Sequence, residues 1–99
     1  MFWVYILKCS DGTYYTGHTD NLEHRLGQHQ GGVCGGYTAT RLPVTLVWSQ
    51  EFASREDALA AERRVKGWSR AKKEAMMLGD WDEVNHLSRG KHVHQRKSL

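Results

Sequence analysis

The sequence lacks a long apolar run, contains two cysteines and shows no internal repeat. No segment approaches the roughly 18 apolar residues of a membrane-spanning helix, so we expect none. The apolar start, Met1 to Leu7, has neither a basic beginning nor a small-residue cleavage site and predicts a strand rather than a signal peptide. Cys9 and Cys34 fit neither a metal-binding spacing nor a disulfide framework. We therefore expect free thiols and a cytoplasmic protein.

Basic residues are unevenly distributed along the 99-residue chain, whose formal net charge is +3. Ten of the fourteen Lys and Arg lie in residues 1–88 with all eleven Asp and Glu, so this part is close to neutral. Residues 89–99 hold the other four bases, and we expect this tail to be disordered. A cluster of bases between residues 63 and 73 suits either a nucleic-acid backbone or a solvated helix face, and charge alone favours the solvated face.

The length of 99 residues predicts one domain, and turn residues and capping patterns predict the element order β-β-α-β-α-α. Strands are expected at 2–7, 13–19 and 44–52, and helices at 20–30, 54–67 and 69–78. Asp20 with Glu23 and Ser54 with Asp57 read as capping boxes, and Ser69 caps the third helix. This order indicates an α/β (more narrowly α+β) fold, a small sheet with helices packed on it.

Two strand patterns predict which side chains are buried. The continuous apolar run at 2–7 predicts a central strand that is covered on both faces. In the third strand, three apolar residues alternate with their neighbours and are expected to share one face: Val44, Leu46 and Trp48.

The turn at Ser10-Asp11-Gly12 decides where two tyrosines of the first hairpin point. A two-residue turn would send Tyr5 and Tyr15 to opposite faces, whereas a three-residue loop pairs Tyr5 with Gly17 and puts both tyrosines on one face. Gly12 supplies the left-handed residue that the three-residue loop needs, so we favour that loop. Gly17 would then leave room for another group to approach the backbone.

Ionisable residues occupy the inner faces of two predicted helices. Leu22 and Leu26 define the buried stripe of the first helix, and Arg25 and His29 lie on the same stripe at helical spacing. Glu62 lies on the otherwise apolar face of the second helix. A charge that faces a core is costly unless it is paired or lies in a polar cleft. The residues allow an Arg25–Glu62 ion pair with His29 beside it, or a functional site, and leave the two about equal.

Together with the hairpin, these helices can bring two phenols, a guanidinium, an imidazole and a carboxylate to one place. That set suits phosphodiester hydrolysis. A carboxylate can hold a divalent cation that polarises phosphate oxygens, and an arginine stabilises the charge that develops on them. A tyrosine or histidine can take a proton from water, although a phenol is a poor base unless cations lower its pKa.

Several short segments follow one another in an order and spacing that are specific together, though each is weak alone. They are Val4-Tyr5-Ile6, Tyr15-Thr16-Gly17, the segment 19–26 with its arginine, Tyr37-Thr38, 41–44, Ala58 to Glu62, and 66–73. On these motifs the sequence resembles the GIY-YIG nuclease domain, and within it the small stand-alone bacterial (YhbQ-like) branch. The resemblance covers roughly residues 1–80, with 81–99 as a C-terminal extension. It implies a three-stranded antiparallel sheet flanked by helices.

The resemblance also implies roles for the candidate residues. Tyr5 and Tyr15 would position or activate the attacking water, and Arg25 would bind the scissile phosphate. Glu62 would be the single protein ligand of Mg²⁺ or Mn²⁺. His29 falls where the family places a tyrosine or histidine near the site.

The sequence departs from the family pattern at Thr16, Val4 and His18, and Asp20-Asn21 inverts a common order. Thr16 replaces the central isoleucine, on the far face of the sheet, and Val4 replaces a small residue. His18 stands where some relatives carry a lysine. We expect six residues to contact DNA: His18, Arg41, Lys66, Arg70, Lys72 and Lys73.

We therefore expect a divalent-metal-dependent DNA endonuclease that cuts one strand at a time, in DNA repair or processing. The alternative is a nucleic-acid-binding module that keeps the fold with little or no turnover. A third reading makes His92-x-His94 a metal site, against a disordered tail. The residues leave open whether the DNA is single-stranded, branched or duplex.

Overall fold

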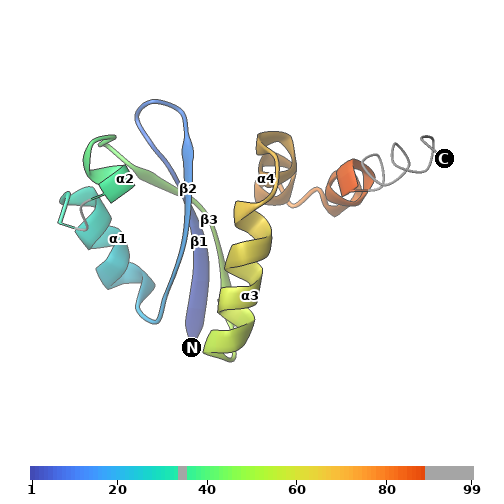
Figure 1. Ribbon diagram of the computed structural model, residues 1–99, viewed down its shortest axis with the longest axis horizontal. Coiled ribbons are helices and arrows are strands. Elements are labelled where there is room, and N and C mark those ends of the chain that lie inside the picture. Colours follow the sequence, from blue (N-terminus) through green and yellow to red (C-terminus); the bar gives the residue numbers. More distant parts are fainter. Residues whose placement is uncertain (34–35, 89–99) are drawn as a thin grey trace. The chain divides into compact units, whose positions relative to one another are not determined.

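The computed structural model describes residues 1–33 and 36–88 (Figure 1). Its elements are β1 (Phe2–Lys8), β2 (Tyr14–Thr19), α1 (Leu22–Gln30), α2 (Gly36–Ala39), β3 (Thr45–Phe52), α3 (Arg55–Lys66) and α4 (Arg70–Met77). Residues 81–88 are also helical. The expectations for Cys34 and for the tail 89–99, with its two histidines, lie outside the described residues. No helix in the described part is long and apolar enough to cross a membrane.

The chain divides into two compact units, Met1–Gly67 and a second that begins at Trp68. The first unit contains the sheet, whose three antiparallel strands lie in the order β2-β1-β3. The expected central strand and the three-stranded antiparallel sheet with helices are thus confirmed. Val4, Ile6 and Leu7 of β1 are fully buried, and each such side chain contributes about 1.5–3 kcal/mol relative to exposure.

The hairpin between β1 and β2 has the register predicted from its turn. Leu7 pairs with Tyr15 and Tyr5 with Gly17. The Cys9 amide donates to the Thr13 carbonyl at 2.8 Å, which closes the three-residue loop. Gly12 has φ of 84°, the left-handed conformation that the loop requires.

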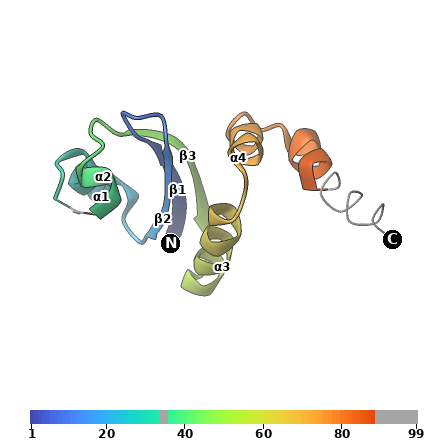
Figure 2. The same ribbon diagram turned by 45° about the horizontal axis from the view of Figure 1, so that its top comes forward.

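Helices cover both faces of the sheet (Figures 1 and 2). α1 and α2 lie on one face, and α3 lies on the other. On the α1 face, a core of Tyr5, Leu7, Cys9 and Val44 packs against Leu22 and Leu26, together with Tyr15 and Leu46. On the other face, α3 buries Ala58 and Val65 and packs against all three strands.

The α1 cap corrects one prediction. The N-cap is Asn21, whose side chain accepts a hydrogen bond from the His24 amide, and not Asp20. The Asn21 amide donates to Oγ1 of Thr19 at 3.1 Å, and this local turn moves the helix start one residue along the chain. The other two caps, Ser54 and Ser69, lie where the sequence placed them, and α3 ends at Gly67 as expected.

A bulge in β3 corrects a second prediction. Leu46 pairs with Leu7, while Trp48 pairs with Ile6, its neighbour in β1. Adjacent residues of a strand point to opposite faces, so Leu46 and Trp48 do not share a face as their spacing suggested. The extra residue, Val47, interrupts the alternation.

Two helices were missed. α2 has four residues and is too short for a periodic signal, and residues 81–88 follow a stretch that is only weakly patterned. Asp80 marks the start of the latter helix, because its Oδ1 accepts a hydrogen bond from the Glu83 amide at 3.1 Å. In this second unit, Ala75, Met76 and Val84 are buried, and Leu78 and Trp81 are exposed.

Candidate functional site

Tyr5 and His29 form a buried pair on the α1 face of the sheet. The Tyr5 hydroxyl lies 2.8 Å from Nε2 of His29, and Nδ1 of His29 lies 2.8 Å from Oγ1 of Thr38. β1 supplies the phenol, α1 the imidazole and α2 the hydroxyl. The helical spacing of Leu22, Leu26 and His29 carries the imidazole into the core, as the sequence predicted.

Gly17 makes this arrangement possible. A Cβ at position 17 would lie 2.6 Å from the Tyr5 hydroxyl oxygen and 2.8 Å from its Cζ. The group that approaches the Gly17 backbone is therefore the phenol of Tyr5. The glycine of the Tyr15-Thr16-Gly17 motif leaves space for the tyrosine of the preceding strand.

Tyr15 joins the same cluster from β2. Its ring centroid lies 6.4 Å from that of Tyr5, 5.2 Å from that of His29 and 6.1 Å from that of Tyr37. Tyr5 is 1% exposed, whereas Tyr15 is only partly buried. Of the two tyrosines, Tyr15 is the one that a solvent-borne substrate reaches more easily.

Arg25 adds a positive charge next to His29. Burial lowers the pKa of the His29 imidazole, and the Arg25 charge lowers it further. Nη1 of Arg25 donates to Oε1 of Gln28 at 3.3 Å. The half-buried guanidinium and the tyrosine cluster thus lie on the same side of the sheet.

Glu62 lies on the opposite face, on α3. Its Oε2 is 2.9 Å from Nδ1 of His18, and its Oε1 is 3.8 Å from Nζ of Lys66. The side chain is buried, with 8% of the residue exposed. His18 follows Gly17 in β2, so it points away from the face that carries Tyr5 and Tyr15.

The candidate residues therefore form two groups on either side of β2. Tyr5, Tyr15, Arg25 and His29 come together on one face, and Glu62 lies with His18 on the other. β2 is an edge strand of the sheet. A ligand that lies along this edge can approach side chains from both faces.

A small cavity opens beside His18. It has a volume of about 180 Å³ and is lined by Phe2, His18, Thr19, Asp20 and Arg55. A larger open hollow of about 570 Å³ lies over α1, and none of the sequence-predicted site residues lines it. The smaller cavity is the one that borders the candidate site.

Glu62 is suited to hold a divalent cation in one particular way. His18 occupies Oε2, while Lys66 lies too far from Oε1 for a hydrogen bond, so Oε1 can take a hard cation. Within residues 1–33 and 36–88, no three His, Cys, Asp or Glu side chains gather as a metal cage. Mg²⁺ is commonly bound by one or two carboxylates, with substrate phosphates and waters completing its shell. A single glutamate at the β2 edge fits that mode.

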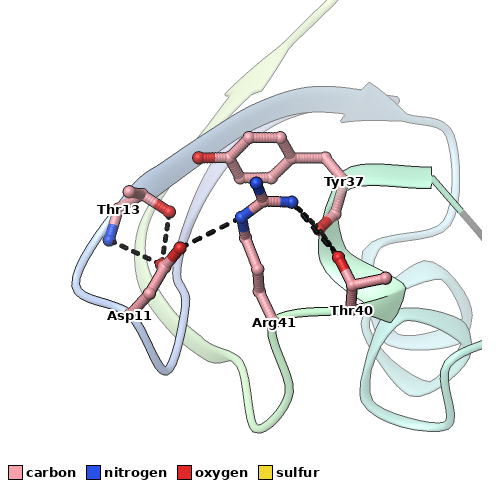
Figure 3. Close-up of polar contacts among 5 residues, drawn as sticks. All are labelled: Asp11, Thr13, Tyr37, Thr40 and Arg41. Atoms are coloured by element: carbon pink, nitrogen blue, oxygen red, sulfur yellow. Dashed lines mark hydrogen bonds and ion pairs between the residues drawn. The ribbon is translucent and has the colours of Figure 1, made fainter.

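Contacts within the protein hold the Arg41 side chain in place (Figure 3). Nε lies 3.0 Å from Oδ2 of Asp11, and Nη1 donates to the Tyr37 carbonyl at 2.9 Å. Cζ lies 3.8 Å from the centroid of the Tyr37 ring. Hydrogen bonds from the Thr13 hydroxyl and amide hold the pKa of Asp11 below its usual range, and Arg41 adds to this effect. These contacts tie the hairpin loop to the segment that follows α2.

Two other predicted DNA contacts, Arg70 and Lys72, also have partners within their own unit. Nε of Arg70 lies 3.3 Å from Oε2 of Glu74, and Nζ of Lys72 lies 4.3 Å from the centroid of the Trp68 ring. Burial lowers the pKa of Lys73. Their role in DNA binding stays a prediction.

The sequence placed Tyr37-Thr38 among the family motifs but indicated no role for either residue in the site. Both lie in α2, and their side chains contact His29 and Tyr15. Their own spacing carries no periodic signal. The available signals were their place in the Tyr37-Thr38 family motif and a buried histidine that needs a partner for each ring nitrogen.

Comparison with known proteins places these residues in a family. The model of the GIY-YIG catalytic domain matches residues 1–75. The chain belongs to the GIY-YIG family. The match includes both strands of the tyrosine hairpin and the helix that carries Glu62.

Individual GIY-YIG relatives support this assignment. A UPF0213 protein of Halobacterium salinarum is 46% identical over 76 residues, which cover 77% of this chain and 99% of the relative. One from Streptococcus pneumoniae is 41% identical and covers 81% of both chains. The solution structure of a UPF0213 protein from Bacillus halodurans superposes with a TM-score of 0.51 at 43% identity, covering 77% of this chain and 82% of that one. The neighbouring folds agree with the sheet and helices described above.

Proposed function

We propose that this protein is a divalent-metal-dependent DNA endonuclease that hydrolyses one strand at a time, in DNA repair or processing in the cytoplasm. The observation that supports it most is the arrangement around β2. Two tyrosines and an arginine lie on one side of the sheet beside this edge strand, and a buried carboxylate lies on the other side. The chain belongs to the GIY-YIG family, and these groups are of the kind that the nuclease chemistry of this family would use.

Each residue has a distinct task in this proposal. Arg25 contacts the scissile phosphate and offsets the negative charge that develops on its oxygens. Tyr15, with Tyr5 behind it, positions the attacking water, and it would accept the proton of that water as a phenolate, the form that the Arg25 charge and a bound cation favour. Glu62 would hold Mg²⁺ or Mn²⁺, and the bound cation would polarise the phosphate oxygens. His18 fixes the orientation of the Glu62 carboxylate, as hydrogen-bonded groups behind a metal ligand commonly do.

Contacts outside the site would come from the basic residues. We propose that His18, Arg41, Lys66, Arg70, Lys72 and Lys73 contact DNA. The cavity of Phe2, His18 and Arg55 borders the Glu62 side of β2 and would receive part of the nucleotide next to the scissile phosphate. Arg41 would act with its guanidinium already fixed by Asp11 and Tyr37, so DNA binding would cost little side-chain freedom.

One experiment tests the function directly. Labelled single-stranded, duplex, flap and branched DNA are incubated with the protein and Mg²⁺, Mn²⁺ or EDTA. Cleavage of one strand with a metal, and none in EDTA, is expected. No cleavage of any substrate with either metal would overturn the endonuclease proposal.

The Glu62→Gln variant tests the metal ligand. It keeps the shape of the side chain and removes its charge, so cleavage should fall by about 10²-fold or more, the scale of losing an electrostatic catalytic group. DNA affinity in EDTA should change little. Glu51→Gln, which changes an exposed glutamate of β3, is the matched control and should cut normally. A Glu62→Gln variant that melts early yet still cuts DNA would make Glu62 a structural partner of His18.

A binding module without turnover is the second candidate. It is favoured by one observation, that Tyr5 and Glu62 are both buried and hydrogen-bonded to neighbouring histidines. This candidate predicts DNA binding in EDTA and no cleavage in metal. Binding and cleavage measured on the same substrates separate the two.

A further inference from the structure

Tyr37 of α2 contacts one of the two site tyrosines and also an arginine. Its ring stacks on that of Tyr15, with the centroids 6.1 Å apart and the ring planes at 27°. The Arg41 guanidinium lies over the Tyr37 ring, with Cζ 3.8 Å from the centroid. Tyr37 thus connects a residue of the candidate site with a predicted DNA contact.

Arg41 is fixed by two parts of the chain. Its Nη1 donates to the Tyr37 carbonyl at 2.9 Å and to Oγ1 of Thr40 at 3.2 Å, which holds the guanidinium beside the ring (Figure 3). Its Nε lies 3.0 Å from Oδ2 of Asp11 in the hairpin loop. The Ser10 amide of the same loop donates to the Arg41 carbonyl at 2.9 Å. Arg41 therefore joins α2 to the hairpin.

Asp11 is also held in place. Its Oδ1 accepts hydrogen bonds from the Thr13 hydroxyl at 2.6 Å and from the Thr13 amide at 3.1 Å. These bonds, with the Arg41 charge, hold the pKa of Asp11 below its usual range, so the carboxylate is charged at neutral pH. Asp11 and Tyr15 belong to the same hairpin, so the contacts form a closed ring that starts and ends there.

We infer that Tyr37 is a positioning residue for Tyr15, and that Arg41 fixes the place of the Tyr37 ring. Tyr37 is 40% exposed, so burial alone does not fix its ring. A guanidinium over the face of a ring attracts it electrostatically, and stacked rings adopt a defined relative geometry. Tyr15 is only partly buried and gains a fixed neighbour from this arrangement.

This arrangement links DNA binding to the position of Tyr15. The guanidinium that is proposed to contact DNA also fixes, through Tyr37, the ring that is proposed to position the attacking water. An error of about 1 Å in the position of a reacting group can cost about 10²-fold in rate. The effect on cleavage rests on the proposed endonuclease function, whereas the ring positions do not.

NMR of the protein with carbon-13-labelled tyrosine, recorded without DNA or metal, tests the ring positions. Nuclear Overhauser effects between the rings of Tyr15 and Tyr37 are expected in the wild type. They should weaken in Arg41→Lys, which keeps the charge but loses the planar group over the Tyr37 ring. Arg63→Lys, at an exposed arginine of α3, is the matched control and should leave them unchanged. Equally strong effects in Arg41→Lys and the wild type would overturn the role of Arg41.

Cleavage kinetics separate positioning from binding. Arg41→Lys should lower kcat about tenfold or more. Its slope of log K against log salt for DNA binding in EDTA should match the wild type, because the charge is kept. Tyr37→Leu should lower kcat to a similar extent, and Tyr37→Phe, which keeps the ring, should restore most of it. Trp81→Leu, at an exposed aromatic residue of the second unit, is the control.

The double variant Arg41→Lys/Tyr37→Leu tests whether the two residues act together. If Arg41 acts on kcat through Tyr37, the double variant should be about as slow as Tyr37→Leu alone. Losses that multiply would show that Arg41 affects kcat independently of Tyr37, and would overturn that part of the inference.

Each remaining outcome bears on one claim. A folded Tyr37→Leu protein with an unchanged kcat would overturn the positioning role while the endonuclease proposal stands. A Tyr37→Phe kcat as low as that of Tyr37→Leu would do the same, because the ring would then not be what matters. A wild-type protein that cuts no DNA would refute the endonuclease proposal, and the spectra would still decide whether Arg41 and Tyr37 hold Tyr15. Should Tyr37→Leu fail to fold, the kcat and the spectrum of Arg41→Lys decide the inference.

Discussion

Gly17 sets the geometry of the tyrosine cluster at the scale of a single residue. Its missing side chain is where the Tyr5 phenol lies, and that phenol in turn is held by His29. The neighbouring Thr16 points to the α3 face, where its Oγ1 has no hydrogen-bond partner among the described residues. Successive side chains of β2 thus point to opposite faces of the sheet.

Gly17→Ala should disturb Tyr5. The new Cβ would lie 2.6 Å from the Tyr5 oxygen, so the phenol must move and its hydrogen bond to His29 is broken. We expect a stability loss of about 1–3 kcal/mol in urea unfolding, as for other overpacked cores. Gly27→Ala is the control, because nothing lies within 4 Å of a Cβ there. In an exposed helical position it should stabilise by roughly 0.5–1 kcal/mol. Equal stability of the two variants would contradict this view of Gly17.

His29 should make stability depend on pH. Burial and Arg25 lower its pKa in the folded protein, while in the unfolded chain it is about 6.5. Between these values the unfolded state binds more protons, so stability is full above about pH 6.5 and falls as pH drops through the folded-state pKa. Urea unfolding at several pH values between 5 and 8 should show a steeper acid loss than in His29→Gln. Gln30→Ala, at an exposed position of α1, removes no titratable group and should keep the wild-type slope; equal slopes for His29→Gln would refute the assignment.

At the scale of elements, α1 depends on its cap and on the segment that follows it. Asn21 starts the helix, and α2 supplies Thr38 and Tyr37 to the two tyrosines. The Arg41–Asp11 ion pair fastens the end of this segment to the hairpin loop. The site therefore relies on a four-residue helix that has little stability of its own.

The cap of α1 can be tested by paired substitutions. Asn21→Ala should cost about 1 kcal/mol, because the His24 amide loses its acceptor. Asp20→Ala removes no cap and should cost only a few tenths of a kcal/mol, through the helix dipole. Chemical unfolding of both variants is the measurement. A larger loss of stability in Asp20→Ala than in Asn21→Ala would show that Asp20 is the cap, as the sequence suggested.

At the scale of the whole molecule, the basic residues belong to two units. Lys66 lies in the first, and Arg70, Lys72 and Lys73 lie in the second. Ion pairs and ring contacts of this kind are weak at exposed positions, so they do not prevent these residues from contacting phosphates.

Neutralising these bases should weaken DNA binding in a salt-dependent manner. A variant that binds one phosphate fewer on duplex DNA should show a slope of log K against log salt that is shallower by about 0.9. Lys66→Gln, Arg70→Gln and Lys72→Gln are compared with Lys8→Gln, which changes an exposed base at the end of β1. Binding is measured in EDTA at several salt concentrations. An unchanged slope would show that these residues face solvent and do not contact DNA phosphates.

Local chemistry explains what the sequence by itself determined. The three-residue loop with Gly12 fixed the hairpin register, and so the shared face of Tyr5 and Tyr15, because turn type and strand alternation are properties of neighbouring residues. The caps at Ser54 and Ser69 followed for the same reason. Spacing of the motifs was enough to indicate the family.

The tertiary structure decided which of these residues meet. Glu62 and Arg25 looked like possible partners on two inward faces, yet their helices cover opposite faces of the sheet and Glu62 pairs with His18. Which face a helix covers depends on packing between distant segments, and no local pattern records it. The β3 bulge, the Asp11–Arg41 contact and the Thr38–His29 hydrogen bond arise in the same way, because each depends on residues that are brought together only when the sheet and its helices close around one core.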